Sequence, residues 1–498
     1  MTTWEGLLYG IGFALQPEVL VYCLLGVVLG TFVGVLPGIG AMAAISLLLP
    51  VTYYITPEAA LIMLAGVYYG AQYGGAVASI LMRLPGTPQS AVTTLDGYPM
   101  AQQGRAGVAL FAAMASSFAG SVIGIVVLVV LAGWLSRAAV AFGAADYAAM
   151  MILGLVAAST IGTARPAKGF AMVVLGLLLG CVGTDVNSGV QRFTFGQTEL
   201  LDGINLVALA MGLFGVAEVI ANVRDPERQS LSERIGLRRL MPTRDDLRRM
   251  GWPTLRGSAL GAFFGALPGT GSTLSSFLSY AMERRVARQP ERFGNGAIEG
   301  IAGPEAANNS ASITAFVPTL TLGIPGDPIM ALMLGALVIH GIQPGPLMLE
   351  ARPEMFWGLV ASFGIGNLIL LVLNLPLIGI WVAMLRIPFR WLYPAILVFL
   401  CLGVYSVRGL SYDIAAVALI GLAGYLLALA RFSPALLLLG FVLGPLIETN
   451  LRRALLISRG DPMVFLERPI AAGFVLATAA LLLLSLWQAW HRRASRRG

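Results

Sequence analysis

Long apolar runs separated by short polar breaks cover almost the whole chain, apart from one arginine-rich polar segment at residues 223–252. Most runs come close to the roughly 20 apolar residues that an α-helix needs to cross the hydrocarbon core of a bilayer. The pattern predicts an all-α polytopic membrane protein with roughly 10–14 membrane segments of that length. The runs lie at residues 18–36, 38–56, 58–82, 107–135, 138–162, 168–184, 203–222, 254–281, 299–323, 329–349, 355–384, 391–407, 412–430, 434–447 and 470–490.

The composition agrees with a membrane protein. Hydrophobic residues make up 57% of the 498 residues and charged residues only 11%, whereas soluble domains carry about a quarter charged residues. This excludes a soluble enzyme, a disordered scaffold and a collagen-like chain. The net charge of +7 comes largely from arginines in short loops, as the positive-inside rule describes. We therefore expect contacts with membrane lipids and none with nucleic acid.

The arginine-rich segment divides the chain. We expect a first membrane repeat at residues 1–222, a cytoplasmic linker at 223–252, and a second membrane repeat with C-terminal helices at 253–498. The basic tail after His491 places the C-terminus in the cytoplasm as well. The first residues show no basic region followed by a small-residue cleavage site, so the sequence predicts no removable signal peptide.

Two Pro-Gly motifs occur once in each half, in the same order. Gly34–Gly40 recurs as Gly265–Gly271, and the later Pro85–Pro88 recurs as Pro325–Pro328. Single matches of this kind arise by chance in glycine-rich membrane proteins, but two ordered pairs at similar spacing indicate a duplication.

The flanking charges predict opposite orientations for the two copies. The 254–281 stretch has arginines on both sides, whereas its counterpart at 18–56 is flanked by Glu18 and Glu58 with no basic residue nearby. Copies that enter from opposite faces form inverted repeats, with Pro-Gly-broken helices or re-entrant hairpins. An alternative stays open, because each arm of 18–56 is long enough to span the membrane alone.

The breaks predict binding sites. Proline removes an N–H and glycine frees the backbone, so broken helices persist in a membrane only where they are buried or line a wet cavity. A half-helix N-terminus attracts a carboxylate, and buried Asn and Ser side chains offer it neutral donors. The competing interpretations are kinks, close packing and helix–helix hydrogen bonds. The candidate substrate-binding residues are Pro37, Gly38, Gly40, Ser79, Pro268, Gly269, Gly271, Ser272, Asn308, Asn309 and Ser310.

The second pair of breaks predicts a cation site. In membrane proteins with broken helices, the carbonyl groups of the unwound backbone can coordinate cations. Asp327 is the acidic residue best placed to add a negative charge to such a site. It could instead close a local turn by accepting nearby backbone N–H groups. The candidate cation-coupling residues are Pro85, Gly86, Thr87, Pro325, Gly326 and Asp327.

Other chemistry finds no support in the sequence. The only lysine, Lys168, lies outside any phosphate-binding loop, which excludes a nucleotide-driven pump. The three cysteines lie far apart, and neither an H-E-x-x-H nor a G-x-S-x-G motif occurs. We expect no enzyme activity, no cofactor and no metal beyond a coupling sodium ion.

Several of these motifs resemble the TctA family, the large membrane subunit of tripartite tricarboxylate transporters. The resemblance runs from about residue 15 to about residue 470. It is carried by Gly34–Gly40, Tyr69–Gly75, Leu84–Pro88, Phe195–Gly196, Leu201–Ile204, Gly212–Glu218, Gly265–Gly271, Glu305–Ser310 and Gly323–Asp327.

The resemblance implies uptake of tricarboxylates or related carboxylates across the bacterial inner membrane, with citrate as the default substrate. It implies a sodium or proton gradient as the driving force, a small four-helix subunit (TctB-like) and a periplasmic solute-binding protein (TctC-like). Elevator-like alternating access follows by analogy with other inverted-repeat transporters, and a homodimer is a further expectation. The alternatives are an ion or anion channel, an intramembrane enzyme, and a purely structural or receptor subunit.

Overall fold

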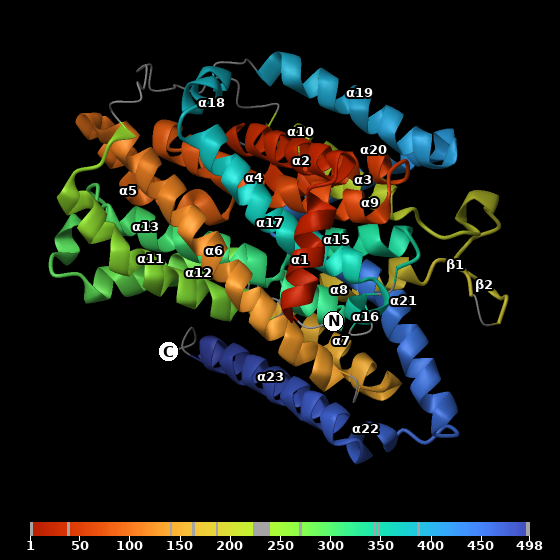
Figure 1. Ribbon diagram of the computed structural model, residues 1–498. Helices are drawn as coiled ribbons and strands as arrows, with labels where there is room; N and C mark the ends of the chain where they lie inside the picture. Colours follow the sequence, from red (N-terminus) through yellow and green to blue (C-terminus); the bar gives the residue numbers. More distant parts are fainter. Residues whose placement is uncertain are drawn as a thin grey trace.

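The computed structural model describes residues 3–36, 40–139, 142–161, 165–185, 188–222, 240–267, 271–342, 344–345, 348–385 and 389–494. These residues are almost entirely α-helical, as the sequence predicts, and they include one very short antiparallel strand pair (Figure 1). Up to residue 222 the elements are α1 (Thr3–Ala14), α2 (Pro17–Val35), α3 (Gly40–Thr52), α4 (Pro57–Met82), η1 (Gln89–Ala91), α5 (Thr93–Met100), η2 (Ala101–Arg105), α6 (Ala106–Ala139), α7 (Ala144–Ile161), α8 (Pro166–Gly180), β1 (Gly183–Thr184), β2 (Gln191–Arg192), α9 (Leu206–Ala210), η4 (Met211–Val216) and α10 (Ala217–Asn222).

The second half begins with α11, which starts at Arg244 and so lies partly within the segment predicted as a linker. Its elements are α11 (Arg244–Gly265), α12 (Gly271–Val286), α13 (Glu299–Thr314), α14 (Phe316–Leu322), α15 (Pro328–Ile339), α16 (Met348–Ala351), α17 (Pro353–Asn374), α18 (Ile378–Met384), α19 (Phe389–Arg408), α20 (Ser411–Leu429), α21 (Pro434–Ile457), α22 (Val464–Glu467) and α23 (Pro469–Ala494).

Five helices of the described chain are long and apolar enough to cross a membrane, and seven shorter apolar helices accompany them. The protein is therefore a multi-pass membrane protein. The central helices α4 and α13 are not among these twelve. They carry polar side chains and small residues that are buried against other helices, so hydropathy alone underestimates their place in the core.

Closely packed glycines join two helices within each repeat, α2 to α4 and α11 to α13. At Gly26, Gly30 and Gly34 of α2, an added Cβ would lie only 2.3–2.4 Å from backbone carbonyl oxygens of α4. The same Gly-x3-Gly-x3-Gly spacing occurs in α11, where a Cβ would lie 2.2–2.3 Å from carbonyl oxygens of α13. Small residues at this spacing let two membrane helices approach backbone to backbone.

Equivalent residues of the two repeats also contact each other. Gln72 of α4 and Ser312 of α13 are 240 residues apart, and Gln72 Nε2 donates to Ser312 Oγ at 3.4 Å. The same separation relates the motifs that begin at Pro85 and Pro325. Contact between equivalent residues is typical of a twofold relation. Whether the repeats are inverted relative to a membrane stays a prediction.

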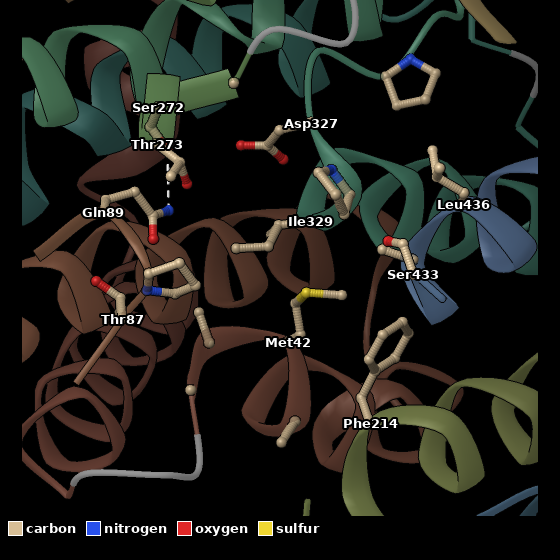
Figure 2. A pocket seen from close by; sticks show the side chains of 18 of the residues that line it. Met42, Thr87, Gln89, Phe214, Ser272, Thr273, Asp327, Ile329, Ser433 and Leu436 are labelled. Atoms are coloured by element: carbon tan, nitrogen blue, oxygen red, sulfur yellow. Dashed lines mark hydrogen bonds between the residues drawn. The ribbon is translucent and has the colours of Figure 1, made fainter. Parts of the chain in front are cut away.

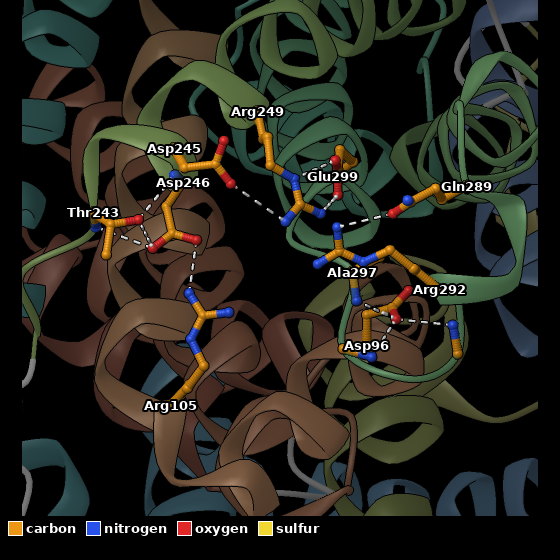
Figure 3. Close-up of polar contacts among 12 residues, drawn as sticks. Asp96, Arg105, Thr243, Asp245, Asp246, Arg249, Gln289, Arg292, Ala297 and Glu299 are labelled. Atoms are coloured by element: carbon orange, nitrogen blue, oxygen red, sulfur yellow. Dashed lines mark hydrogen bonds and ion pairs between the residues drawn. The ribbon is translucent and has the colours of Figure 1, made fainter.

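One ion pair joins the two repeats at one end of the bundle, and a second lies beside it within the second repeat (Figure 3). Arg105, which follows α5, binds Asp246 of α11 with an Nη2–Oδ1 distance of 2.6 Å. Arg249 of the same helix binds Glu299 at the start of α13 at 2.7 Å. Figure 1 shows α11–α13 in green beside α5 and α6 in orange, which agrees with these contacts.

A second group of helices packs around the repeats. Helix α8 packs on α21 through Gly176 and Gly440, where an added Cβ would lie 2.0 and 2.3 Å from carbonyl oxygens of the other helix. Helix α7 contacts α21 and α23, and α20 packs on η4. We call α7, α8, η4, α20 and α21 the peripheral group, and from here on "the repeats" means α2–α6 and α11–α15.

Candidate functional site

A cavity of about 660 Å³ lies where the broken helices of both repeats meet the peripheral group (Figure 2). Its walls come from the starts of α3 and α12, the two Pro-Gly turns, the start of α15, and residues of α7, η4, α10 and α21. The predicted site residues among its lining are Gly40, Pro85, Gly86, Thr87, Gly271, Ser272, Pro325 and Asp327. Residues that the sequence assigns to separate halves therefore share one cavity.

The helix starts at Gly40 and Gly271 have the same backbone conformation, with φ = +66° at both residues. Glycine adopts this left-handed conformation without the steric cost that a side chain adds. The first N–H groups of a helix have no partner within the helix, so α3 and α12 each direct a partial positive charge to the cavity. The other predicted residues of these breaks, Pro37, Gly38, Pro268 and Gly269, lie outside the described residues.

The second pair of breaks follows left-handed helix ends. Arg83 ends α4 with φ = +58° and Gly323 ends α14 with φ = +70°. In the first turn, a Cβ on Gly86 would lie 2.0 Å from the carbonyl oxygen of Gly34, so only glycine fits beneath the end of α2. In the second turn, a Cβ on Gly326 would lie 2.9 Å from the Cβ of Ala315, and Gly326 is not part of the cavity lining.

Asp327 joins the two repeats at the cavity wall. Its Oδ1 accepts the backbone N–H of Met330 at 2.9 Å, which caps α15. Its Oδ2 accepts the hydroxyl of Tyr68 from α4 at 2.5 Å. The carboxyl group therefore accepts a local backbone N–H group, as the alternative interpretation expects. It also borders the cavity, as the predicted cation site requires.

Gln89 and Ser272 form a second bridge between the repeats. Gln89 Nε2 donates to Ser272 Oγ at 2.9 Å (Figure 2), and the buried Gln89 Oε1 has no hydrogen-bond partner among the described residues. Thr87 lines the same side and donates to Gln72 Oε1 at 3.4 Å. This side of the cavity therefore offers amide and hydroxyl groups that can bind an oxygen-rich ligand.

The opposite wall is apolar and comes largely from distant parts of the chain. Its large side chains include Phe214 of η4 and Leu436 of α21, with Met42 and Ile329 from the repeats. Asp327 and Glu218 are the only charged residues of the lining, and no Arg, Lys or His of the described chain borders the cavity. Helix N-termini and neutral donors are therefore the groups of the described lining that can bind an anion.

The remaining predicted substrate residues lie inside the helix bundle, away from the cavity lining. Ser79 Oγ is buried without a hydrogen-bond partner among the described residues, and Ser310 Oγ donates to the Ser258 carbonyl at 2.9 Å. Asn308 Nδ2 donates to Gln72 at 3.3 Å, and Asn309 Nδ2 donates to Ser117 at 2.8 Å. In this conformation Asn308, Asn309 and Ser310 connect helices.

Tyr68, Gln89 and Phe214 contribute to the site although the sequence assigns none of them to it. Gln89 directly follows a predicted turn, so proximity to the break is a signal that points to it. Tyr68 and Phe214 lie in apolar runs and carry no local signal. For metals, the described residues contain no group of three or more His, Cys, Asp or Glu that could hold an ion, so the sodium site stays a prediction.

Comparison with known proteins agrees with this architecture. The chain matches the family model described as "Tripartite tricarboxylate transporter TctA family" over residues 20–439. It is 49% identical to an uncharacterized 52.8 kDa protein in the TAR-I ttuC' 3' region of Agrobacterium vitis, over 96% of this chain and 95% of that protein. It is 52% identical to an uncharacterized protein in the TAR-II ttuC' 3' region of the same organism, over 45% of this chain and 93% of that protein. No solved structure matches. The chain belongs to the TctA family and is thus a large membrane subunit of a tripartite tricarboxylate transporter.

Proposed function

We propose that this subunit imports a tricarboxylate or related carboxylate across the bacterial inner membrane, driven by a sodium or proton gradient. Ligand delivery by a TctC-like periplasmic binding protein and association with a TctB-like small subunit belong to the same proposal, as does a cytoplasmic C-terminus. The observation that carries it is the single cavity between the broken helices of both repeats.

The substrate carboxylate binds between the starts of α3 and α12. Gly40 and Gly271 present the helix N-termini there, and Ser272 with Gln89 supplies neutral polar groups. Since anions are stabilised at helix N-termini, this side of the cavity suits one carboxylate group. The apolar wall around Phe214 suits the carbon skeleton of the substrate.

A coupling cation binds near Thr87 and Asp327. Both residues line the cavity, and they hold equivalent positions in the two turns. A carboxylate alone faces a large desolvation cost in the membrane, which the charge of a co-transported cation offsets. The lack of a cationic side chain in the described lining supports this need for a cation.

The packing supports an elevator-like motion. The hairpins and their supporting helices α4 and α13 pack on each other through both repeats, whereas η4 and α21 contribute one wall of the cavity. Sliding of the repeats against the peripheral group would carry the cavity from one side of the membrane to the other. A homodimer, in which the peripheral group would form the fixed contact, stays a prediction.

The test is uptake of labelled citrate by cells that express the chain with its small subunit and binding protein. Uptake is measured with sodium, with choline in place of sodium, and with an uncoupler. Accumulation against a gradient supports the proposal, and loss of accumulation in choline or with the uncoupler identifies the coupling ion. Movement of citrate only down its concentration gradient, without accumulation, would favour the alternative that the protein is a channel. Absence of transport and of counterflow across a panel of mono-, di- and tricarboxylates would overturn the proposal.

A further inference from the structure

Eight acidic residues are buried in the described part of the chain, and most of them have an evident charge partner. Five form ion pairs with arginines, and Asp96 is held by backbone amides. The two others are Asp327, which caps α15, and Glu305 of α13. The five paired acids are Asp146, Asp185, Asp246, Glu283 and Asp413.

Within the described part of the chain, Glu305 is hydrogen-bonded by neutral side chains and forms no ion pair. Its side chain is buried, with 1% of its surface exposed. Thr93 of α5 donates its hydroxyl to Oε1, and Ser117 of α6 donates its hydroxyl to Oε2 at 3.3 Å. Burial of a carboxylate without a counter-charge is costly, so such a group takes up a proton or a cation. Both oxygens contact hydroxyl groups, and a hydroxyl can turn to accept a hydrogen bond. A proton can therefore bind here without displacing a neighbouring side chain.

Two unsatisfied amide oxygens lie on the same helix. Asn308 and Asn309 are three and four residues after Glu305, which places them on the same helix face. Asn308 Oδ1 and Asn309 Oδ1 are buried and have no hydrogen-bond partner among the described residues. Asn309 Nδ2 also donates to Ser117 Oγ at 2.8 Å. The surroundings can therefore accept a further hydrogen bond when the carboxyl group gains or moves its proton.

A short chain of polar contacts leads from this cluster to the cavity. Asn308 Nδ2 donates to Gln72 Oε1 at 3.3 Å, and Thr87 Oγ1 donates to the same oxygen at 3.4 Å. Thr87 lines the cavity. Asn308, one helix turn after Glu305, and Gln72 thus lie between the carboxyl group of Glu305 and Thr87 of the proposed cation site.

The ionisable groups on the neighbouring helices are engaged elsewhere. Tyr73 of α4 donates to Asn367 at 2.6 Å. Asp96 of α5 accepts three backbone N–H groups at 2.8–2.9 Å and a Tyr280 hydroxyl from α12. Arg256 of α11 and Glu283 of α12 form an ion pair with a 2.6 Å contact. None of these groups supplies a counter-charge to Glu305 in the described structure.

We propose that Glu305 is a proton-binding site of the transport cycle, separate from the cavity and connected to it through Asn308, Gln72 and Thr87. The inference rests on the proposed transport function and adds a residue to it. In the protonated form the site is neutral and suits burial within the moving helices. In the ionised form it places a negative charge next to the cavity, so protonation and occupation of the cavity influence each other.

The transport test uses the full system in membrane vesicles, with the wild-type chain and Glu305→Gln. Glutamine keeps the size and hydrogen bonding of the side chain but cannot release a proton. We expect accumulation driven by an imposed pH gradient to fall about tenfold or more, in the range of typical coupling energies, while substrate counterflow stays within about twofold of wild type. Asp96→Asn is the matched control and should keep pH-driven accumulation. Undiminished pH-driven accumulation by Glu305→Gln, or wild-type uptake that ignores the pH gradient, would overturn the inference.

A second measurement does not depend on the substrate. In the purified full-length chain, infrared difference spectra between acid and alkaline pH should show a carboxylic acid band that Glu305→Gln lacks and Asp96→Asn keeps. Ser117→Ala, which removes one hydroxyl donor, should keep the band and change the pH at which it disappears. If all these spectra are identical, the proton site is wrong even where transport is confirmed. If the band is present but no carboxylate is transported or exchanged, the proposed function fails instead.

Discussion

The hydroxyl of Tyr68 in the first repeat lies 2.5 Å from the Asp327 carboxylate in the second repeat. The two residues are 259 positions apart, and their contact closes the wall of the cavity between the repeats. Asp327 is thereby fixed in the orientation that caps α15. The packing of α4 on the second repeat thus controls the geometry of the proposed cation site.

Tyr68→Phe should weaken transport without unfolding the protein. A hydrogen bond to a charged group contributes about 1.5–3 kcal/mol, and each 1.4 kcal/mol corresponds to about tenfold. We therefore expect the half-saturating concentration of the coupling ion to rise about tenfold or more. Initial rates of uptake across a range of sodium and proton concentrations measure this change.

The matched control is Tyr73→Phe, one helix turn further along α4. Its hydroxyl donates to Asn367 of α17, outside the cavity lining. If Tyr68→Phe and Tyr73→Phe show the same half-saturating concentration of the coupling ion, Asp327 does not bind that ion.

Gln89→Ile should reduce affinity for the substrate. Isoleucine is the residue that the second repeat carries at the equivalent position, Ile329, so its size is compatible with this fold. The change removes the hydrogen bond to Ser272 and the free amide oxygen at the cavity. An unpaired buried polar group costs about 1–3 kcal/mol, so we expect KM to rise about tenfold with the maximal rate little changed.

Gln103→Ala serves as the control for Gln89→Ile, because Gln103 donates to a backbone carbonyl at the surface end of the bundle. Its kinetics should match those of wild type. An unchanged KM in Gln89→Ile would remove this side chain from the substrate site.

The helical fold and the paired breaks could be predicted from the sequence, because apolar periodicity and Pro-Gly motifs are local signals. The glycine spacing in α2 and α11 is also a local signal, visible in the sequence as two Gly-x3-Gly-x3-Gly runs. In contrast, the partners of Glu305 are 212 and 188 residues distant. No local pattern reveals which of several buried acids lacks an arginine, since that depends on how the helices pack.

The position of Asn308–Ser310 shows the same limit. Polar residues inside an apolar run predict a costly environment that needs partners, and that prediction does not distinguish a ligand from another helix. Asn308 contacts Gln72 and Asn309 contacts Ser117. Their partners in this conformation are therefore side chains of other helices, which only the tertiary packing reveals. Whether they also act in transport remains a prediction, which the Glu305 experiments test indirectly.

Gly261→Ala should destabilise the second repeat. A Cβ at this position would lie 2.2 Å from the carbonyl oxygen of Ala307, so α11 would have to move away from α13. Overpacking of this kind costs about 1–3 kcal/mol, which should lower the melting temperature of the purified protein in detergent. Gly364→Ala in α17 is the control, because no atom lies within 4 Å of the added Cβ. A similar melting temperature for the two variants would contradict the packing argument.

The orientation of the repeats can be tested at the starts of α2 and α11. Gln16 precedes α2, and Arg248 lies in the first turns of α11; both side chains are exposed. Because equivalent helices enter from opposite faces in inverted repeats, single cysteines at these two positions should react from opposite sides of the membrane. The measurement is labelling with a membrane-impermeant thiol reagent in a chain whose Cys23, Cys181 and Cys401 have been replaced.

Intact cells with a permeable outer membrane should label Gln16→Cys, whereas Arg248→Cys should react only after the inner membrane is opened. The arginines around the start of α11 favour the cytoplasmic side for that helix, and the acidic Glu18 beside Gln16 is compatible with the periplasmic side. Labelling of both positions from the same side would show parallel repeats. In that case the twofold relation between Gln72 and Ser312 would lie along the membrane normal, and the elevator-like motion would lose its structural basis.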